Sequence, residues 1–325
     1  MSSKNEILAI LEKNRGSAVS GEAISKQLDI SRNAVWKNIN TLKKEGYKIS
    51  SVTNKGYALE IENDIISEQG IYANMKKPEI AKILTYKTVD STNLEARRIA
   101  DGKAENMTVI VSEEQTSGRG RLGRSFFSPA NSGIYMSVIL RPEKIGANPV
   151  LITTAVCVAV LRAIKQSTQL NPQIKWVNDL FLNNKKICGI LTEGITSIES
   201  GSIEYIISGI GINFSTLSDD FPKDLQNTAG SLFGNSDNVS ISRNQLIASI
   251  IENINSITSP LKAESFIDEY KQNSMIIGKD IVFIKKGQQF NAKAIDIDST
   301  GGLIVEMENG QIQTLNSGEI SVRKI

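Results

Sequence analysis

The hydrophobic periodicity of the sequence changes twice along its 325 residues, and no single pattern of secondary structure accommodates all of it. The first part has apolar residues at helical spacing, the middle part mixes helix-like and strand-like runs, and the last part has short alternating runs. A chain of this length also exceeds what one hydrophobic core usually organises. The sequence therefore predicts a multi-domain α+β protein.

Residues 1–62 have the order of elements of a winged helix-turn-helix domain. An amphipathic helix is predicted over residues 5–12, and Ser20 and Ser31 stand where helix N-caps are expected. The helix after Ser31 is the longest and should end near Gly46. The following residues alternate like two short strands joined at the turn Asn54-Lys55-Gly56.

This N-terminal segment is also basic, because residues 1–60 contain ten Lys or Arg and six Asp or Glu. The outward side of the third helix and the tip of the hairpin offer groups that bind phosphates and read base edges. The alternative is a small helical interaction domain with a solvated basic face. The predicted DNA-binding residues are Ser31, Arg32, Asn33, Lys37, Asn40 and Lys55.

The remainder of the chain divides again. Residues 60–82 are polar and predict a linker with one short helix. Residues 63–275 predict a central α+β domain with a mixed β-sheet, and residues 276–325 predict a small SH3-like β-barrel of five short strands. The expected central strands are 107–115, 133–140, 186–194 and 205–214, and the expected helices are 94–100, 150–164, 243–257 and 264–270.

The sequence contains no histidine and two cysteines, Cys157 and Cys188. Ser-His-Asp and Cys-His nucleophile pairs and His-ligated metal sites are therefore excluded. Lysine, arginine, carboxylates and backbone amides remain, and they suit phosphoryl or nucleotidyl transfer. The two thiols lie far apart in apolar surroundings, no secretory signal is visible, and the longest uncharged run, 145–161, is too short for a membrane span. We expect a cytoplasmic protein.

Residues 114–129 contain the most informative segment, in which three glycines alternate with three arginines. Glycine lets the backbone approach a ligand closely, and arginine donates to phosphate or carboxylate oxygens. A P-loop is one alternative, since residues 118–125 read G-x-x-x-x-G-R-S, but the usual Lys is replaced by Arg124 and no helix should begin at Phe126. An exposed basic loop is the other alternative, although it has little use for Phe126 and Phe127.

This segment resembles the signature loop GRGRxGRxWxS of biotin–protein ligases, with Phe126 where that family often has Trp. Further motifs follow in the order typical of the family. The strand with the essential lysine is similar to residues 185–193, which places that lysine at Lys186. The other similar motifs are Ser91-Thr92-Asn93, the KWVNDL segment 175–180 with Val177 in place of Pro, and the glycine strand 209–214.

With a winged helix before the ligase domain, the chain resembles the bifunctional ligases that are also biotin operon repressors of the BirA type. The resemblance implies a class II synthetase-like central domain that makes biotinyl-5′-AMP from biotin and ATP with Mg²⁺, without a tightly bound prosthetic group. The biotin would then pass to a lysine of a biotin carboxyl carrier protein. Operator DNA and a ligand-promoted homodimer are the other implied partners. The alternatives are a lipoate–protein ligase, a repressor whose ligase site has lost activity, and a ligase whose winged helix no longer binds DNA.

The resemblance also implies roles for individual residues, and some have simpler explanations. Lys186 could be one of a solvated lysine pair, Asp179 could cap a turn, and Ser91 and Asn93 could cap a helix. Gly209 and Gly211 could allow close packing alone. Mg²⁺ would lie near Asn178 or Asp179, without His or Cys ligands. The implied catalytic residues are Lys186, Arg119, Arg121 and Asp179; the biotin-binding residues are Ser91, Thr92, Asn93, Gln115, Arg119, Gly120, Arg121, Lys186, Gly189, Gly209 and Gly211; and the residues for ATP or the adenylate are Arg119, Arg121, Arg124, Phe126, Asn178, Lys186 and Asn213.

Overall fold

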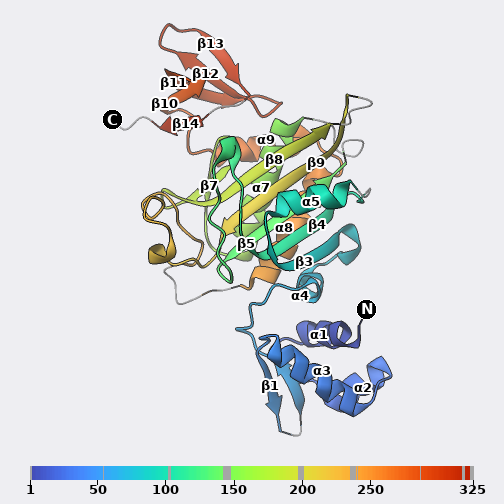
Figure 1. The fold of residues 1–325 in the computed structure, drawn as a ribbon. Helices are drawn as coiled ribbons and strands as arrows, with labels where there is room; N and C mark the ends of the chain where they lie inside the picture. Colours follow the sequence, from blue (N-terminus) through green and yellow to red (C-terminus); the bar gives the residue numbers. More distant parts are fainter. Residues whose placement is uncertain are drawn as a thin grey trace. The chain divides into compact units, whose positions relative to one another are not determined.

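The fold was analysed in a computed structural model of the chain (Figure 1). The chain forms two compact units: unit 1 comprises Met1–Glu79 and Val239–Ser249, and unit 2 comprises Ile80–Asn238 and Ile250–Ile325. The structure describes residues 2–53, 55–101, 104–141, 148–196, 201–234, 239, 241–285, 287–316 and 319–322.

Unit 1 begins with the predicted winged helix-turn-helix. The three helices pack around a shared apolar core, and the two strands that follow pair as an antiparallel hairpin. Asn54 at the tip of this hairpin lies outside the described residues. The elements are α1 (Ser3–Lys13), α2 (Gly21–Leu28), α3 (Arg32–Lys44), β1 (Ile49–Val52) and β2 (Gly56–Leu59).

Local chemistry accounts for the element boundaries. The hydroxyl of Ser20 accepts a hydrogen bond from the backbone of α2, and that of Ser31 does the same for α3, as the N-cap prediction requires. Gly56 has φ +111°, and a Cβ there would lie 2.1 Å from the carbonyl oxygen of Val19. The absence of a side chain lets Val19 and Tyr57 exchange two backbone hydrogen bonds of 2.9 Å.

The segment after the hairpin was predicted as a polar linker, and the structure corrects this for its first half. The short helix is present as α4 (Glu68–Asn74), followed by a 3₁₀ turn, Pro78–Ile80. Ile66 and Ile71 are buried, and α4 packs against α1. The segment is thus part of the packed interior of unit 1.

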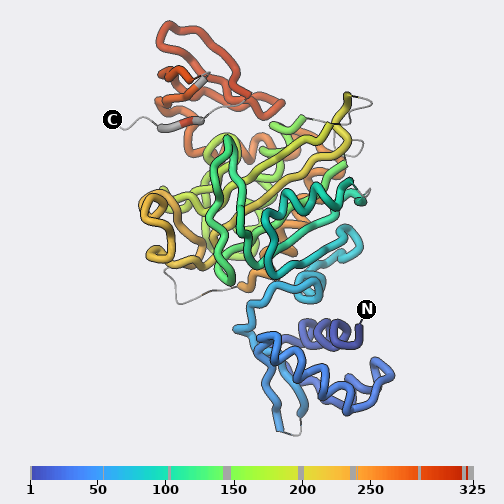
Figure 2. The backbone as a smooth tube through the Cα atoms, in the orientation of Figure 1, coloured from blue at the N-terminus to red at the C-terminus, as the bar shows by residue number. Residues whose placement is uncertain are grey.

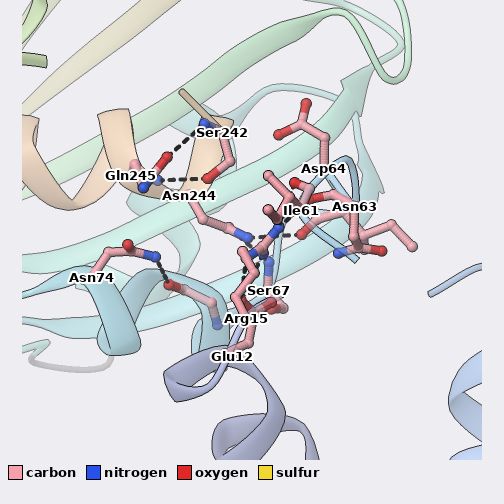
Figure 3. Close-up of polar contacts among 12 residues, drawn as sticks. Glu12, Arg15, Ile61, Asn63, Asp64, Ser67, Asn74, Ser242, Asn244 and Gln245 are labelled. Carbon is pink, nitrogen blue, oxygen red and sulfur yellow. Dashed lines mark hydrogen bonds and ion pairs between the residues drawn. The ribbon is translucent and has the colours of Figure 1, made fainter. Parts of the chain in front are cut away.

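Charged side chains hold this segment in place (Figure 3). Arg15 at the end of α1 pairs with Glu12 at 2.6 Å and donates to the carbonyl oxygens of Ile61 and Asn63. The Glu12 carboxylate is fully buried, and this burial raises the pKa of Glu12 in spite of the opposing charge of Arg15.

A second pair lies at the start of helix α8 (Arg243–Thr258). The Arg243 side chain is 2% exposed and donates from Nε to Oδ2 of Asp64 at 2.7 Å, while its backbone N–H donates to Oδ1 at 2.8 Å. Asn244 donates to the carbonyl of Ile65 and accepts from the backbone N–H of Ser67. Residues 61–67 are therefore held by side chains far away in the sequence.

Asp64→Ala is expected to lower the free energy of unfolding by about 2 kcal/mol, because it removes the Asp64 carboxylate that accepts from the buried Arg243 guanidinium and backbone N–H. The value lies below that of a fully buried pair because the Asp64 side chain is 34% exposed. Urea denaturation measures the effect. Glu62→Ala is the matched control, since Glu62 is an exposed neighbouring carboxylate. Equal losses for both variants would contradict the assignment.

Unit 2 is built on a seven-stranded sheet with the order β3-β4-β5-β9-β8-β7-β6. The β3–β4 pair is parallel and the other pairs are antiparallel, which confirms the predicted mixed sheet. Strands β3, β6 and β7 were not predicted from the sequence. The strands are β3 (Lys82–Val89), β4 (Thr108–Gln115), β5 (Gly133–Leu140), β6 (Gln173–Lys175), β7 (Asp179–Leu182), β8 (Lys185–Thr196) and β9 (Ile203–Asn213).

Helices cover both faces of this sheet (Figure 1). Helix α5 (Thr92–Ala100) packs its alanines on β4, β5 and β9. Helix α7 (Pro149–Ser167) lies on the opposite face, with α9 (Ile267–Gln272) packed against it. Helix α7 has the length and apolar composition of a membrane span, but most of its side chains are buried within the unit.

The end of unit 2 is a separate five-stranded antiparallel sheet with the order β13-β12-β11-β10-β14, as predicted for a small all-β domain. The indole N–H of Trp176 donates to the carbonyl of Gly301 at 2.9 Å and so connects this sheet to the central domain. The strands are β10 (Asp280–Lys285), β11 (Gln288–Ile297), β12 (Leu303–Met307), β13 (Ile312–Leu315) and β14 (Glu319–Val322).

Candidate active site and DNA-binding surface

A cavity of about 300 Å³ lies on the α5 side of the central sheet. Gly189 of β8 and Gly209 and Gly211 of β9 contribute to its lining, and the loop Gly118–Ser128 between β4 and β5 forms one wall, traced in green in Figure 2. The lining residues are Ser91, Thr92, Asn93, Gln115, Arg119, Gly120, Arg121, Leu122, Arg124, Ser125, Phe126, Lys175, Trp176, Asn178, Asp179, Lys186, Gly189, Ile190, Leu191, Gly209, Ile210, Gly211 and Ile320.

The loop Gly118–Ser128 is held by its own backbone. Gly120 donates to the carbonyl of Arg124 at 2.7 Å, and Phe126 donates to that of Gly118 at 2.9 Å. A Cβ at Gly118 would lie 2.4 Å from the Phe126 carbonyl oxygen, so only glycine fits there. The chain continues as an extended segment where a P-loop would begin a helix, which excludes the P-loop interpretation.

Positive charge gathers at one end of the cavity. Nζ of Lys186 lies 2.6 Å from a carboxylate oxygen of Asp179 on the neighbouring strand. Nη1 of Arg121 donates to the Oδ1 atom of Asn178 at 2.8 Å. Asp179 is the first residue of β7 and pairs with Gly189, so it belongs to the sheet and faces the lysine. These groups can neutralise and orient an anionic ligand.

Neutral polar groups form the other end of the cavity. Gln115 accepts from the backbone N–H of Thr92 at 2.8 Å, and Ser137 donates to Oδ1 of Asn93 at 2.7 Å. A Cβ at Gly209 would lie 2.1 Å from the same oxygen. Ser91 occupies the N-cap position of α5, but its side chain makes no capping hydrogen bond, so lining of the cavity is the contribution of this side chain that the structure shows.

Glu193 positions this polar end, although no role was predicted for it. Its carboxylate accepts from Nδ2 of Asn93 at 2.7 Å, and it lies 3.8 Å from Nη1 of Arg119. Glu193 therefore lies between the neutral and the cationic groups of the cavity. Its place at the end of the motif 185–193 was the signal that could have identified it.

Phe126 lies over the glycine strand. A Cβ at Gly211 would lie 2.6 Å from its ring, and the ring meets Tyr135 edge-on with centroids 6.5 Å apart. Lys186 and Phe126 both approach Gly189. The small residues of β8 and β9 thus make room for the aromatic ring and the lysine on one face of the sheet.

The structure brings together every predicted ligand or catalytic residue of the central domain except Asn213. Asn213 lies at the end of β9, is buried, and donates to the carbonyl of Gly230 at 2.9 Å, so it connects the strand to a neighbouring loop. The lining residues without a predicted role are Leu122, Ser125, Lys175, Trp176, Ile190, Leu191, Ile210 and Ile320, of which Ile320 comes from β14 of the C-terminal sheet.

Cysteine chemistry is excluded at this site. Cys157 and Cys188 are both fully buried, and burial raises the pKa of each thiol. They stay protonated at neutral pH and cannot serve as nucleophiles. The cavity therefore offers positioning and charge, as the absence of histidine also implied.

In unit 1 the residues predicted to bind DNA gather on α3 and the hairpin. Arg32, Asn33 and Lys37 are exposed, Asn40 is partly exposed, and Lys55 is exposed beside the hairpin tip. The hydroxyl of Ser31 is the N-cap acceptor of the helix.

Comparisons with known proteins agree with this architecture. Residues 85–213 match the Biotin/lipoate A/B protein ligase family, residues 3–58 match an HTH domain, and residues 276–323 match the Biotin protein ligase C terminal domain. The chain is 32% identical to the bifunctional ligase/repressor BirA of Bacillus spizizenii and to that of Bacillus subtilis, each time over 98% of this chain and 98% of the relative.

A solved structure extends the similarity to the fold. The biotin protein ligase from Aquifex aeolicus in complex with biotin and ATP superposes with a TM-score of 0.64 at 25% identity, and the match covers 75% of this chain and 99% of that one. The three family models match successive segments of the chain, and the 32% identity to the two relatives extends over 98% of it. The chain belongs to the family of bifunctional biotin ligase/repressor proteins.

Proposed function

We propose that the chain activates biotin with ATP to biotinyl-5′-AMP and transfers the biotin to a lysine of a biotin carboxyl carrier protein. In the first step the biotin carboxylate attacks the α-phosphate, a phosphorus–oxygen bond forms, and pyrophosphate leaves. In the second step the lysine amine attacks the carbonyl carbon of the mixed anhydride, an amide bond forms, and AMP leaves. The observation that carries this proposal is that Arg119, Arg121 and Lys186 line the same cavity as the neutral polar residues Thr92, Asn93 and Gln115.

The first step brings two anions together, so its main requirement is positive charge. A carboxylate is already a nucleophile at neutral pH, and no protein base is needed. Lys186, Arg119 and Arg121 supply the charge, while Thr92, Asn93 and Gln115 would bind the neutral ureido ring, which offers both donors and an acceptor. The spacing of the two groups of residues thus fits a ligand with one neutral polar end and one anionic end.

The second step releases a proton from the acceptor amine. Asp179 is the candidate acceptor of that proton, because its carboxylate lies in the cavity and already faces the Lys186 ammonium at 2.6 Å. ATP would bind as its Mg²⁺ complex, and Asn178 and Asp179 offer the oxygen atoms that Mg²⁺ prefers. Asn213 would act indirectly, by holding the end of the glycine strand.

The same proposal assigns the chain to the cytoplasm, where ATP and thiols in reduced form are found. It also keeps the three-domain division at residues 62/63 and 275/276 as a prediction. The activity is tested by incubating the full-length protein with ATP, a carrier domain, and biotin or lipoate, and by measuring the mass of the carrier. We expect a mass increase with biotin that requires ATP. If lipoate and not biotin modified the carrier, the protein would be a lipoate–protein ligase instead.

Phe126→Ala is expected to weaken ATP binding by about 1–3 kcal/mol, because Phe126 is proposed to stack on the adenine. Biotin binding should change little, since Thr92, Asn93 and Gln115, the residues proposed to bind the ureido ring, are unchanged in this variant. Calorimetric titrations with biotin and with a non-hydrolysable ATP analogue distinguish the two effects. Phe127→Ala serves as the control, because Phe127 packs against Phe221, with ring centroids 5.9 Å apart. Equal losses of both ligands in Phe126→Ala would show that the ring is only part of the core.

We also propose that the winged helix represses biotin synthesis or uptake genes. A single winged helix presents one recognition helix and one wing, and tight specific binding usually needs two half-sites on a two-fold axis. A homodimer of the ligase domain, promoted by biotinyl-AMP, would supply that symmetry. When carrier protein is scarce, the adenylate persists and the operator is occupied.

A further inference from the structure

Helix α3 exposes an indole ring that the function described so far does not use. Trp36 is 54% exposed, whereas the opposite side of the helix is buried through Val35, Ile39 and Leu42. Among the described residues of unit 1, the exposed large apolar side chains are Trp36, Ile61 and Val239, and Trp36 is the one that lies on α3. Aromatic rings are enriched at binding interfaces, and this indole lies beside cationic side chains, which makes it a candidate contact residue.

The surroundings of Trp36 define the chemistry of what it contacts. The ring borders a groove on α3 that is lined by three lysines and two uncharged polar side chains, so the partner is anionic. The indole N–H can donate to a single phosphate oxygen, but the apolar face of the ring gains contact only with a partner that also presents an apolar group. The groove is lined by Trp36, Lys37, Asn40, Thr41, Lys43 and Lys44.

In the major groove of DNA the apolar group on the base edges is the C5-methyl of thymine. We infer that Trp36 is a specificity-determining residue that packs on thymine methyl groups of the operator; this rests on the proposed operator binding. Trp36 and Asn40 are one helical turn apart, with Cβ atoms about 5–6 Å from each other. That distance is less than two base-pair rises of about 3.4 Å.

The pair therefore reads neighbouring base pairs. An asparagine amide recognises adenine through its N6 and N7 atoms, while the indole recognises thymine. Each operator half-site contains, on this reasoning, a thymine within two base pairs of the adenine read by Asn40. Lys37, Lys43 and Lys44 supply phosphate contacts, which position the helix without reading sequence.

The test uses duplexes selected from a randomised library by the full-length protein with biotin and ATP. Each thymine of the selected half-site is replaced by deoxyuridine, which removes one methyl group and leaves the base pairing intact. Wild-type protein should lose about fourfold in affinity at the contacted thymine, the value expected for one buried methyl group. Trp36→Ala should bind the thymine duplex about tenfold more weakly and should lose nothing further on the deoxyuridine duplex.

Two further variants complete the test. Trp36→Phe retains an aromatic ring and should therefore still lose part of its affinity when the contacted thymine is replaced by deoxyuridine. Ile61→Ala removes another exposed apolar side chain of unit 1, which lies outside α3, and this variant should show the full loss of affinity on the deoxyuridine duplex. The slope of log affinity against log salt concentration reports the number of counterions released on binding. This number should fall by about one in Lys37→Ala and should not fall in Trp36→Ala.

The outcomes separate this inference from the function on which it rests. A deoxyuridine penalty of the same size in Trp36→Ala would overturn the inference, and so would an equal loss by Trp36→Ala on random-sequence DNA. In both cases operator binding would stand. Failure of the library to yield any preferred sequence would instead overturn the operator-binding proposal itself.

Discussion

Replacing Lys186 with alanine is expected to slow adenylate formation by about 10²–10³-fold, the usual effect of losing one charged donor that acts on the transition state. Lys186 lines the cavity together with residues of the loop Gly118–Ser128, and its ammonium is 2.6 Å from the carboxylate of Asp179 on β7. Its loss removes the positive charge that offsets the approaching carboxylate and phosphate. It also leaves the Asp179 carboxylate as an additional repulsive charge. Pyrophosphate release at saturating biotin and ATP measures the effect.

The neighbouring lysine provides the matched control. Nζ of Lys185 donates to the backbone carbonyl of Gln226 at 3.1 Å, and Lys185 does not line the cavity. Lys185→Ala removes the same charge one residue away and should leave the rate within about twofold, since a partly exposed charge outside the cavity is screened by solvent. Near-normal pyrophosphate release by Lys186→Ala, or an equal loss of rate in both variants, would contradict the catalytic role proposed for Lys186.

Biotin and ATP together are expected to lower the protein concentration needed for half-occupancy of the operator by on the order of 100-fold, near the upper end of typical coupling between two sites. The physical reason is linkage. A ligand that favours the dimer must favour operator binding, and the operator must in turn tighten the dimer. Operator titrations with and without both ligands measure the shift, and excess acceptor domain should reverse it by consuming the adenylate.

Lys186→Ala makes this prediction sharper, because it tests whether the adenylate is the effective ligand. Biotin and ATP should produce no shift in this variant within the time in which the wild type responds. Superimposable wild-type titrations with and without the ligands would contradict the coupling. The chain would then be a ligase and a DNA-binding domain that are merely joined.

Local sequence patterns were enough to predict the parts of this protein that depend on neighbours in the chain. Helices α1 to α3 have apolar residues at helical spacing and serine N-caps, so their boundaries follow from local chemistry. The glycine and arginine residues of 118–124 indicated a close approach to an anion, and the structure shows that loop at the cavity. The family motifs likewise placed Lys186, Asn178 and Gly209 in one site before any contact was known.

Strands β3 and β7 escaped prediction for a physical reason. Strand β3 lies at the edge of the sheet, and its exposed Lys82 and Lys87 weaken the apolar alternation. Strand β7 has four residues and is too short for a period to be visible. Strand β3 is placed by its pairing with β4, from which α5 separates it in the chain. Strand β7 is placed by the tight turn at Asn183 and Asn184, both with positive φ, that folds it back onto β8.

The packed segment 61–67 shows the same limit most clearly. Its polar composition indicates a linker, because polar residues normally stay in water. Here its backbone groups are bonded by Arg15 and by Arg243 and Asn244, and the last two lie nearly 180 residues away along the chain. Glu193 and Ile320 enter the site in the same way, through strands that only the folded chain brings together. Residue types and spacing decided which chemistry is possible, whereas long-range hydrogen bonds and packing, which no local pattern records, decided which groups meet.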